Sequence, residues 1–146
     1  MKHYGQFISI LSRERMHFED ITSQVREAVS KSGITEGIAC IFSMHTTSCI
    51  RINENEERLL YDFKSFLERL APASARYLHD DIEKRDCPKD EPLNGHSHLK
   101  SLLLGASETV PVVNGEMLLG KWQSIFHVDL DGVNRQRKVM VKVMGD

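Results

Sequence analysis

The C-terminal part of the chain carries the feature that most restricts its fold, a series of strand-like segments joined by tight turn signals. Residues 109–113 lead through Asn114-Gly115 into a second apolar segment over 116–120. Polar and apolar residues then alternate over 123–131, and an Asp-Gly pair precedes a closing segment over 139–143. Two-residue connections of this kind join antiparallel neighbours. The sequence therefore predicts an antiparallel sheet in this half of the protein.

The first half of the chain alternates between helical and strand-like patterns. Apolar residues recur at helical spacing over 19–31 and over 55–70, where Asn53 or Glu54 could cap the second helix. The near-continuous apolar run over 38–44 predicts a central strand that is covered on both faces. Further strands are predicted over 7–11 and 48–53. The whole order predicts one α+β domain over residues 1–146, a largely antiparallel sheet with helices packed on it.

A long segment with little apolar periodicity separates the second helix from the C-terminal strands. Residues 73–97 are rich in Asp, Pro, Asn, Gly and His, which predicts a loop. Loops of this length in a compact domain usually serve a function. Ser97 is placed to cap a short helix over 98–104 that Gly105 ends. This arrangement predicts that His96 lies before the helix, where it is exposed to solvent or assists the site from its periphery.

Composition excludes several classes of protein. A net charge of −2 over 146 residues gives no basic footprint for binding nucleic acid. Cys40, Cys49 and Cys87 are odd in number and lack CxxC spacing, which argues against a disulfide framework or a structural zinc knuckle. The first residues carry no apolar signal segment, and no apolar run is long enough to cross a membrane. The expectation is a cytoplasmic protein without a membrane or nucleic-acid partner.

Three histidines stand at the edges of predicted elements, each beside polar neighbours. They are His45, His79 and His98. Loops at one end of a sheet converge in space, so three such imidazoles could hold a divalent metal ion, with Asp80 or Glu54 orienting a ligand. They would equally suit acid–base catalysis, or the binding of a phosphate by imidazolium. Residue spacing leaves these alternatives open.

Several other polar side chains are candidates for contact with a phosphorylated substrate. They are Thr46, Thr47, Ser48, Arg51, Lys100 and Gln123. Hydroxyl groups and a guanidinium in one short stretch are suited to a phosphate, although the same residue types are common on ordinary strands. On the strand over 123–131, Phe126 and Val128 are expected to face the core, and His127 and Asp129 the opposite, exposed face.

The polar motifs, in their order along the chain, resemble those of the YjbQ family. The motifs are His45-Thr46-Thr47-Ser48, Asn53-Glu54, His79-Asp80, Ser97-His98-Leu99-Lys100, Gly120-Lys121-Trp122-Gln123 and Asp131-Gly132. Each motif is weak alone, but their shared order and spacing are specific and cover essentially the whole chain. The sequence departs from the family pattern at Lys121, Asp129 and Val133-Asn134-Arg135, which bears on the substrate more than on the fold.

The resemblance implies an α+β subunit that forms a homotrimer, with a divalent metal ion such as Zn or Mg held by His45, His79 and His98. It also implies a secondary thiamine-phosphate synthase activity, which joins a pyrimidine methyl diphosphate to a thiazole phosphate and releases pyrophosphate. In that reading His45, Glu54, His79 and His98 are the catalytic residues. The alternatives are a trimer that binds a metal or a phosphorylated metabolite without turnover, and a metal-dependent hydrolase.

Overall fold

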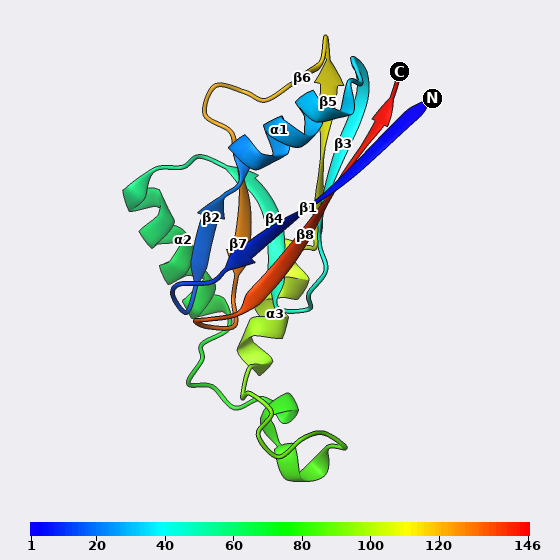
Figure 1. Cartoon of the computed structure of the whole chain (residues 1–146). Coiled ribbons are helices and arrows are strands. Elements are labelled where there is room, and N and C mark those ends of the chain that lie inside the picture. Colours follow the sequence, from blue (N-terminus) through cyan, green and yellow to red (C-terminus); the bar gives the residue numbers. More distant parts are fainter.

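The strands form two antiparallel sheets that share one core (Figure 1). The computed structural model describes all 146 residues. The larger sheet has the order β1 (Lys2–Leu11), β8 (Gln136–Gly145), β3 (Glu36–Ser43), β5 (Ser107–Val113) and β6 (Glu116–Met117). The smaller sheet has the order β2 (His17–Asp20), β7 (Ser124–Asp129) and β4 (Ser48–Asn53). The predicted α+β class with antiparallel strand pairing is confirmed, and the strands are divided between two sheets.

The helices divide between the two sheets. Helix α1 (Thr22–Ser32) buries Val25, Ala28 and Val29 against the inner face of the larger sheet. Helices α2 (Glu57–Leu70) and α3 (Gly95–Leu104) cover the outer face of the smaller sheet, where Leu67 of α2 packs with Phe126. No helix of the protein is both long and apolar enough to cross a membrane.

Helix boundaries differ from the predictions where polar residues act as caps. Helix α2 begins after Glu56, whose carboxylate accepts hydrogen bonds from the amides of Arg58 and Leu59, so neither Asn53 nor Glu54 caps it. Helix α3 begins at Gly95, so Ser97 lies inside it rather than at its cap. The segment before α3 contains two short 3₁₀ turns, η1 (Leu78–Asp80) and η2 (Ile82–Lys84), and projects from the body of the protein (Figure 1).

Strand β7 is buried on both of its faces, which corrects one prediction. Phe126 and Val128 lie under α2 and α3, whereas Ile125 belongs to the core between the two sheets. His127 and Asp129 share that inner side and are 0% exposed. The expected exposed face is absent because the larger sheet covers it.

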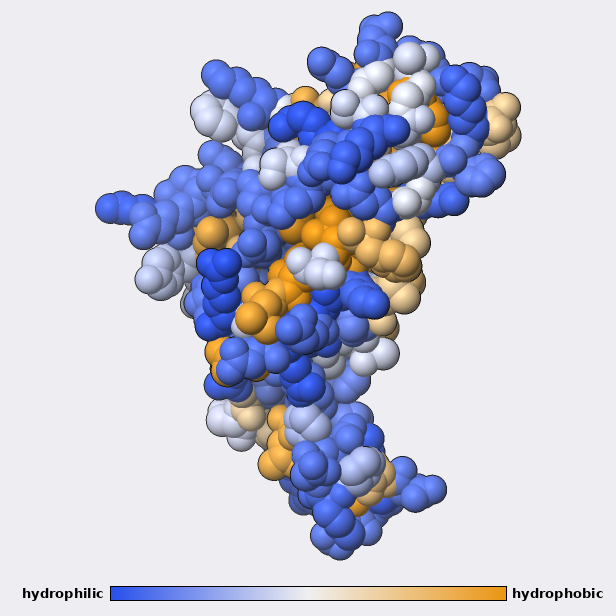
Figure 2. Space-filling view, in the orientation of Figure 1, coloured by the Kyte–Doolittle hydropathy of each residue, from blue (hydrophilic) through white to orange (hydrophobic).

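Strand β3 was predicted to be covered on both faces, but one of its faces is exposed to solvent. Ile38 and Phe42 are exposed, because α1 lies on the inner side of the larger sheet and no helix covers its outer side. The strand register aligns Phe7, Met140 and Phe42 in one row across β1, β8 and β3. In Figure 2 hydrophobic surface is gathered in the middle of the view, over the region where Figure 1 shows β1 and β8. We call this row and Ile38 the open apolar face.

Candidate functional site

The first turn of α3 brings two of the predicted histidines together. The rings of His79, on η1, and His98, on α3, have centroids 4.5 Å apart. Asp80 holds the two elements in place, because its Oδ1 accepts a hydrogen bond of 2.9 Å from the amide of Gly95. Gly95 has no room for a side chain here, since a Cβ would lie 2.6 Å from the Cβ of Tyr77. The sequence did not identify this helix-capping role of Asp80.

The surroundings of His98 disfavour its protonated form. Burial, together with the positive charge of His79 when it is protonated, lowers the pKa of His98 below its ordinary value. The Nδ1 atom of His79 is buried and makes no hydrogen bond, and the Asp80 carboxylate lies 3.6 Å from it. A neutral imidazole beside an unpartnered ring nitrogen is suited to accept a proton or to bind a metal ion.

His45 lies in the connection between β3 and β4 and is fixed by the backbone. Its Nε2 accepts a hydrogen bond of 2.9 Å from the amide of Lys138. Because that nitrogen is an acceptor, the proton of the neutral ring is on Nδ1. Burial and the nearby positive charge of Arg137 lower the pKa of His45, so the neutral form is favoured.

An open cavity of about 640 Å³ joins His45 to His98. One side of it is formed by the end of β3 and the following connection, and the other by α3 and the residues after it. Its lining residues are Phe42, Ser43, Met44, His45, Thr46, His98, Ser101, Leu102, Gly105 and Ala106. This volume lies within the range of pockets that bind small metabolites. We call it the histidine cavity; His79 contacts it through His98.

The three histidines do not form a closed metal site within one subunit. No group of three His, Cys, Asp or Glu side chains is arranged so that it could hold a metal ion. His79 and His98 are adjacent, while His45 lies on the other side of the cavity. The adjacent pair could supply two ligands, and further ligands would come from a substrate, water or another subunit.

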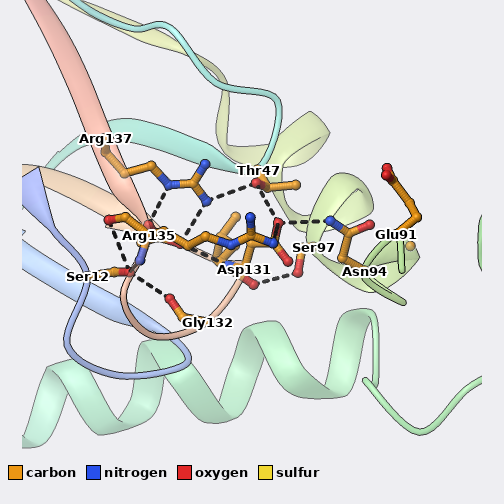
Figure 3. Close-up of polar contacts among 12 residues, drawn as sticks. Ser12, Thr47, Glu91, Asn94, Ser97, Asp131, Gly132, Arg135 and Arg137 are labelled. Carbon is orange, nitrogen blue, oxygen red and sulfur yellow. Dashed lines mark hydrogen bonds and ion pairs between the residues drawn. The ribbon is translucent and has the colours of Figure 1, made fainter. Parts of the chain in front are cut away.

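A buried network of charges lies near His45 (Figure 3). The Arg137 guanidinium pairs with Asp129 through Nε–Oδ2 at 2.6 Å and Nη2–Oδ1 at 3.0 Å. It also donates to the Thr47 hydroxyl at 3.0 Å, which in turn donates to Asp131 at 3.1 Å. Asn94, which precedes α3, donates to the same Asp131 carboxylate at 2.8 Å. The network thus ties β7, β8 and the connection before β4 to the start of α3, and the sequence did not indicate it.

The predicted hydroxyl contacts separate into one open and two buried groups. Thr46 lines the histidine cavity and is exposed. Thr47 is buried within the charge network, and the hydroxyl of Ser48 lies 2.6 Å from that of Ser43. Of the three, only Thr46 can meet a ligand in the cavity without rearrangement of the core.

The predicted cations lie away from the histidine cavity. Lys100 is 1% exposed and pairs with Glu68 of α2 at 2.8 Å, on a different side of α3 from His98. Arg51 pairs with Glu108 at 2.9 Å. Both charges are therefore already compensated within the fold, at positions that do not line the cavity.

Glu54 and Gln123 lie at the opposite end of the smaller sheet from the histidines. The register pairs Ser48 with Asp129 at one end and Asn53 with Ser124 at the other. Six residues of extended strand separate these ends by about 20 Å. Within one subunit, therefore, Glu54 and Gln123 do not reach His45.

Two residues outside the predicted site have unusual surroundings. His96 was expected to be exposed but is buried, with Nδ1 facing the Ser97 hydroxyl and the Lys100 ammonium. Burial raises the pKa of the Cys49 thiol to about 11. Cys49 is therefore protonated near neutral pH and packs as a buried side chain.

These features define a class of protein: a two-sheet α+β subunit with an open, histidine-lined cavity beside α3. A family model described as "UPF0047 protein YjbQ-like" matches residues 6–146, and the chain belongs to the YjbQ (UPF0047) family. The sequence-based recognition of this family is confirmed.

Individual relatives support the same assignment. A UPF0047 protein of Methanothermobacter thermautotrophicus is 46% identical over 145 residues, which cover 99% of this chain and 94% of the relative. The Bacillus subtilis protein YugU is 34% identical over 140 residues, covering 94% of this chain and 97% of YugU. A crystal structure from Sulfolobus solfataricus, described as a YbjQ-like protein of unknown function, has a TM-score of 0.91 at 34% identity and covers 99% of both chains.

Proposed function

We propose that the protein is a small-molecule enzyme that acts in the histidine cavity on a phosphorylated substrate, with thiamine-phosphate synthase activity as the leading candidate. The observation that carries the proposal is the adjacent pair His79 and His98, with a lowered pKa at His98 and a ring nitrogen on His79 that makes no hydrogen bond. The specific reaction is taken from the family resemblance described above. It joins a pyrimidine methyl diphosphate to a thiazole phosphate.

The chain's own residues suggest how the substrates would be held. His45 carries its ring proton on Nδ1, so it can donate a hydrogen bond to a phosphate oxygen. The exposed Thr46 hydroxyl, in the same cavity, can donate a second. His98 is favoured in its neutral form and can accept a proton during the reaction. Phe42 and Met44 offer apolar surface to a ring at the mouth of the cavity.

A divalent metal ion fits the histidine pair better than the rest of the cavity. The Nδ1 of His79, which makes no hydrogen bond in the fold, and the imidazole of His98 are nitrogen donors, which suit zinc more than magnesium. When bound, such an ion would supply positive charge that stabilises a pyrophosphate leaving group. His45 is a less direct ligand, because its Nε2 already accepts a backbone hydrogen bond.

A second candidate function is binding without turnover. The observation that favours it is that Arg51 and Lys100, the expected neutralising cations, are paired with Glu108 and Glu68 instead of lining the cavity. A site with few free cations is better suited to hold a ligand than to expel a pyrophosphate. A metal-dependent hydrolase would use the same histidines with water as the nucleophile.

The first test is an assay with both substrates on protein purified without a histidine tag. We expect thiamine phosphate and pyrophosphate as products, and a loss of about 100-fold or more in kcat for His98→Ala, because an acid–base group or ligand is removed. Metal analysis of the same samples should show loss of the ion in His79→Ala and His98→Ala. The control is His3→Ala, which alters an exposed histidine on β1.

The outcomes separate the candidates. Saturable binding of the thiazole phosphate without product would favour the binding protein. Release of inorganic phosphate from either substrate alone would favour the hydrolase. Unchanged metal content in both variants would refute the metal assignment, and unchanged turnover in them would show that the activity comes from a contaminant.

We further propose that the subunit forms a homotrimer and that the neighbouring copy completes the site. Phe42 belongs both to the open apolar face and to the lining of the histidine cavity, so a copy seated on that face would also close the cavity. In such a trimer, Glu54 and Gln123 of one subunit would approach the histidine cavity of its neighbour. Within one subunit they are at the far end of β4 and β7.

Assembly is tested by placing a charge on the open apolar face. Sedimentation of the parent protein should give the mass of a trimer, three times the 16.7 kDa of one subunit. The Phe42→Asp variant should sediment as a monomer, because a carboxylate buried in the subunit contact is costly. Ser23→Asp, an exposed position on α1 at the opposite side of the larger sheet, is the control and should remain trimeric. A monomeric parent protein would refute the assembly.

The trimer also predicts complementation between inactive subunits. If Glu54 acts across the boundary, mixed refolding of Glu54→Gln with His98→Ala chains should restore about a quarter of parental activity, since random assembly leaves that share of sites intact. Full activity of Glu54→Gln alone would exclude Glu54 from the site.

A further inference from the structure

A second cavity lies on the outer face of the smaller sheet, between α2 and α3. Its volume is about 300 Å³. Phe18 and Phe126 form its floor, Phe63 and Phe66 of α2 form one wall, and Leu104 of α3 forms the other. Four of the six phenylalanines of the chain therefore line one cavity. We call it the phenylalanine cavity.

The cavity exists because α2 does not close onto the sheet. The helix carries an apolar stripe, yet Leu67 is its only buried residue, and Phe66 remains half exposed. The aromatic rings around the gap are already ordered against one another. Phe18 stacks on Phe63 with centroids 5.8 Å apart and meets Phe126 edge-on at 6.0 Å. A ligand that filled the gap would restore the dispersion contacts that these rings now lack.

Two polar side chains stand at one edge of the cavity and define what such a ligand must carry. Arg51 donates from Nη1 to the Leu104 carbonyl at 3.0 Å and pairs with Glu108 at 2.9 Å, so its position is fixed and its charge is compensated. Its other N–H groups have no partner in the fold. Asn53 uses Oδ1 to accept from the amide of Glu54, which leaves its amide N–H groups as donors. Both residues therefore offer donors without net charge, which suits a neutral acceptor.

The size of the cavity limits the ligand to a small ring system. A cavity of about 150 Å³ with a similar apolar lining holds one benzene ring, and this cavity has about twice that volume. We propose that the phenylalanine cavity binds a flat, two-ring aromatic or heteroaromatic molecule with one neutral hydrogen-bond acceptor, such as a carbonyl group, directed at Arg51 and Asn53.

This site is separate from the histidine cavity. The two cavities have no lining residue in common, since Leu104 lines only the phenylalanine cavity and Ser101 and Leu102 line only the histidine cavity. A ligand in the phenylalanine cavity would pack α2 against the sheet, so it should slow hydrogen exchange of the α2 amides. Binding there does not depend on the reaction proposed for the histidines.

The test uses 1-indanone and indane, two probes of nearly equal shape of which only the first has a carbonyl group. In NMR titrations of the full chain both should shift the signals of α2 and β4, and 1-indanone should bind about fivefold more tightly, as expected for one neutral hydrogen bond. Arg51→Met should reduce that difference. Leu104→Trp should abolish binding by filling the cavity, and Leu103→Trp, an exposed neighbour outside it, should bind as the parent does.

Two further measurements keep the outcome decisive. Phe66→Trp fills the cavity from α2 and replaces Leu104→Trp if that variant does not fold, as judged by its circular dichroism. Absence of shifts with both probes at their solubility limits would overturn the proposal. The proposal would also be overturned if Leu104→Trp and Phe66→Trp bound 1-indanone as tightly as the parent protein does. If filling the cavity instead changes the oligomeric state, the occupant is a second copy of the chain and the proposal is wrong.

Discussion

Arg137→Met is expected to lower the free energy of unfolding by about 3–5 kcal/mol, the usual result of removing one partner from a buried ion pair. Asp129 is 0% exposed, and Arg137 contacts both of its carboxylate oxygens. Without the guanidinium the carboxylate would keep only its hydrogen bond from the Asp131 amide. A charge so poorly compensated inside a core is strongly unfavourable. Thr47 would also lose its donor.

Urea unfolding at pH 7 measures this effect. The double variant Asp129→Leu with Arg137→Met should recover most of the lost stability, because it removes both charges together. Lys31→Met is the control, since it breaks an exposed ion pair with Glu27 on α1 and should cause no measurable change. A loss below about 1 kcal/mol for Arg137→Met would show that the buried pair is hydrated or rearranged.

The second large effect is a dependence of stability on pH that comes from His127. Burial lowers the pKa of His127 to about 4 from an ordinary value of 6.5. Asp129 opposes this shift, whereas Arg137, His45 and His17 add to it. Neither ring nitrogen has a hydrogen-bond partner. The folded protein therefore holds His127 neutral in a pH range where the unfolded chain would protonate it.

The direction of the effect follows from proton uptake by the unfolded chain. Above pH 6.5 neither state protonates the ring, and the stabilisation is complete. As the pH falls from 6.5 to 4, protonation of His127 in the unfolded chain lowers the free energy of unfolding. The part of this loss that is attributable to His127 reaches about 3 kcal/mol. In His127→Leu this part of the pH dependence should disappear, with stability at pH 8 equal to or above that of the parent.

Urea unfolding at a series of pH values between 4 and 8 tests this prediction. His3→Leu, at an exposed position on β1, is the matched control and should retain the parental profile. An unchanged slope in His127→Leu would assign the acid sensitivity to other groups, such as the carboxylates of the charge network.

The predictions from sequence succeeded where the signal was local. The turn at Asn114-Gly115, the helix ending at Leu70 and the alternation along β7 are encoded by neighbouring residues, and each is present in the structure. Alternation divides a strand into two faces but does not say what covers them. For that reason His127 was expected outside and is buried, while Phe42 was expected inside and is exposed.

The site was only partly predictable for a related reason. His79 and His98 are adjacent because the segment that carries His79 folds back on α3. The positions of Glu54 and Gln123 depend on strand register across the smaller sheet. The pairing of Lys100 with Glu68 depends on how α2 lies beside α3. Neither the strand register nor the packing of α2 beside α3 can be predicted from the spacing of residues along the chain.

The hydrogen bond from the Gly95 amide to Asp80 has a consequence for how the protein can fail. It attaches the projecting segment, and His79 with it, to the first turn of α3. That segment contributes no residue to either hydrophobic core cluster, so it can detach at little cost to the rest of the fold. Heat or protease could thus inactivate the protein while both sheets stay intact. A melting curve that reports unfolding of the sheets would then overstate the temperature up to which the protein remains functional.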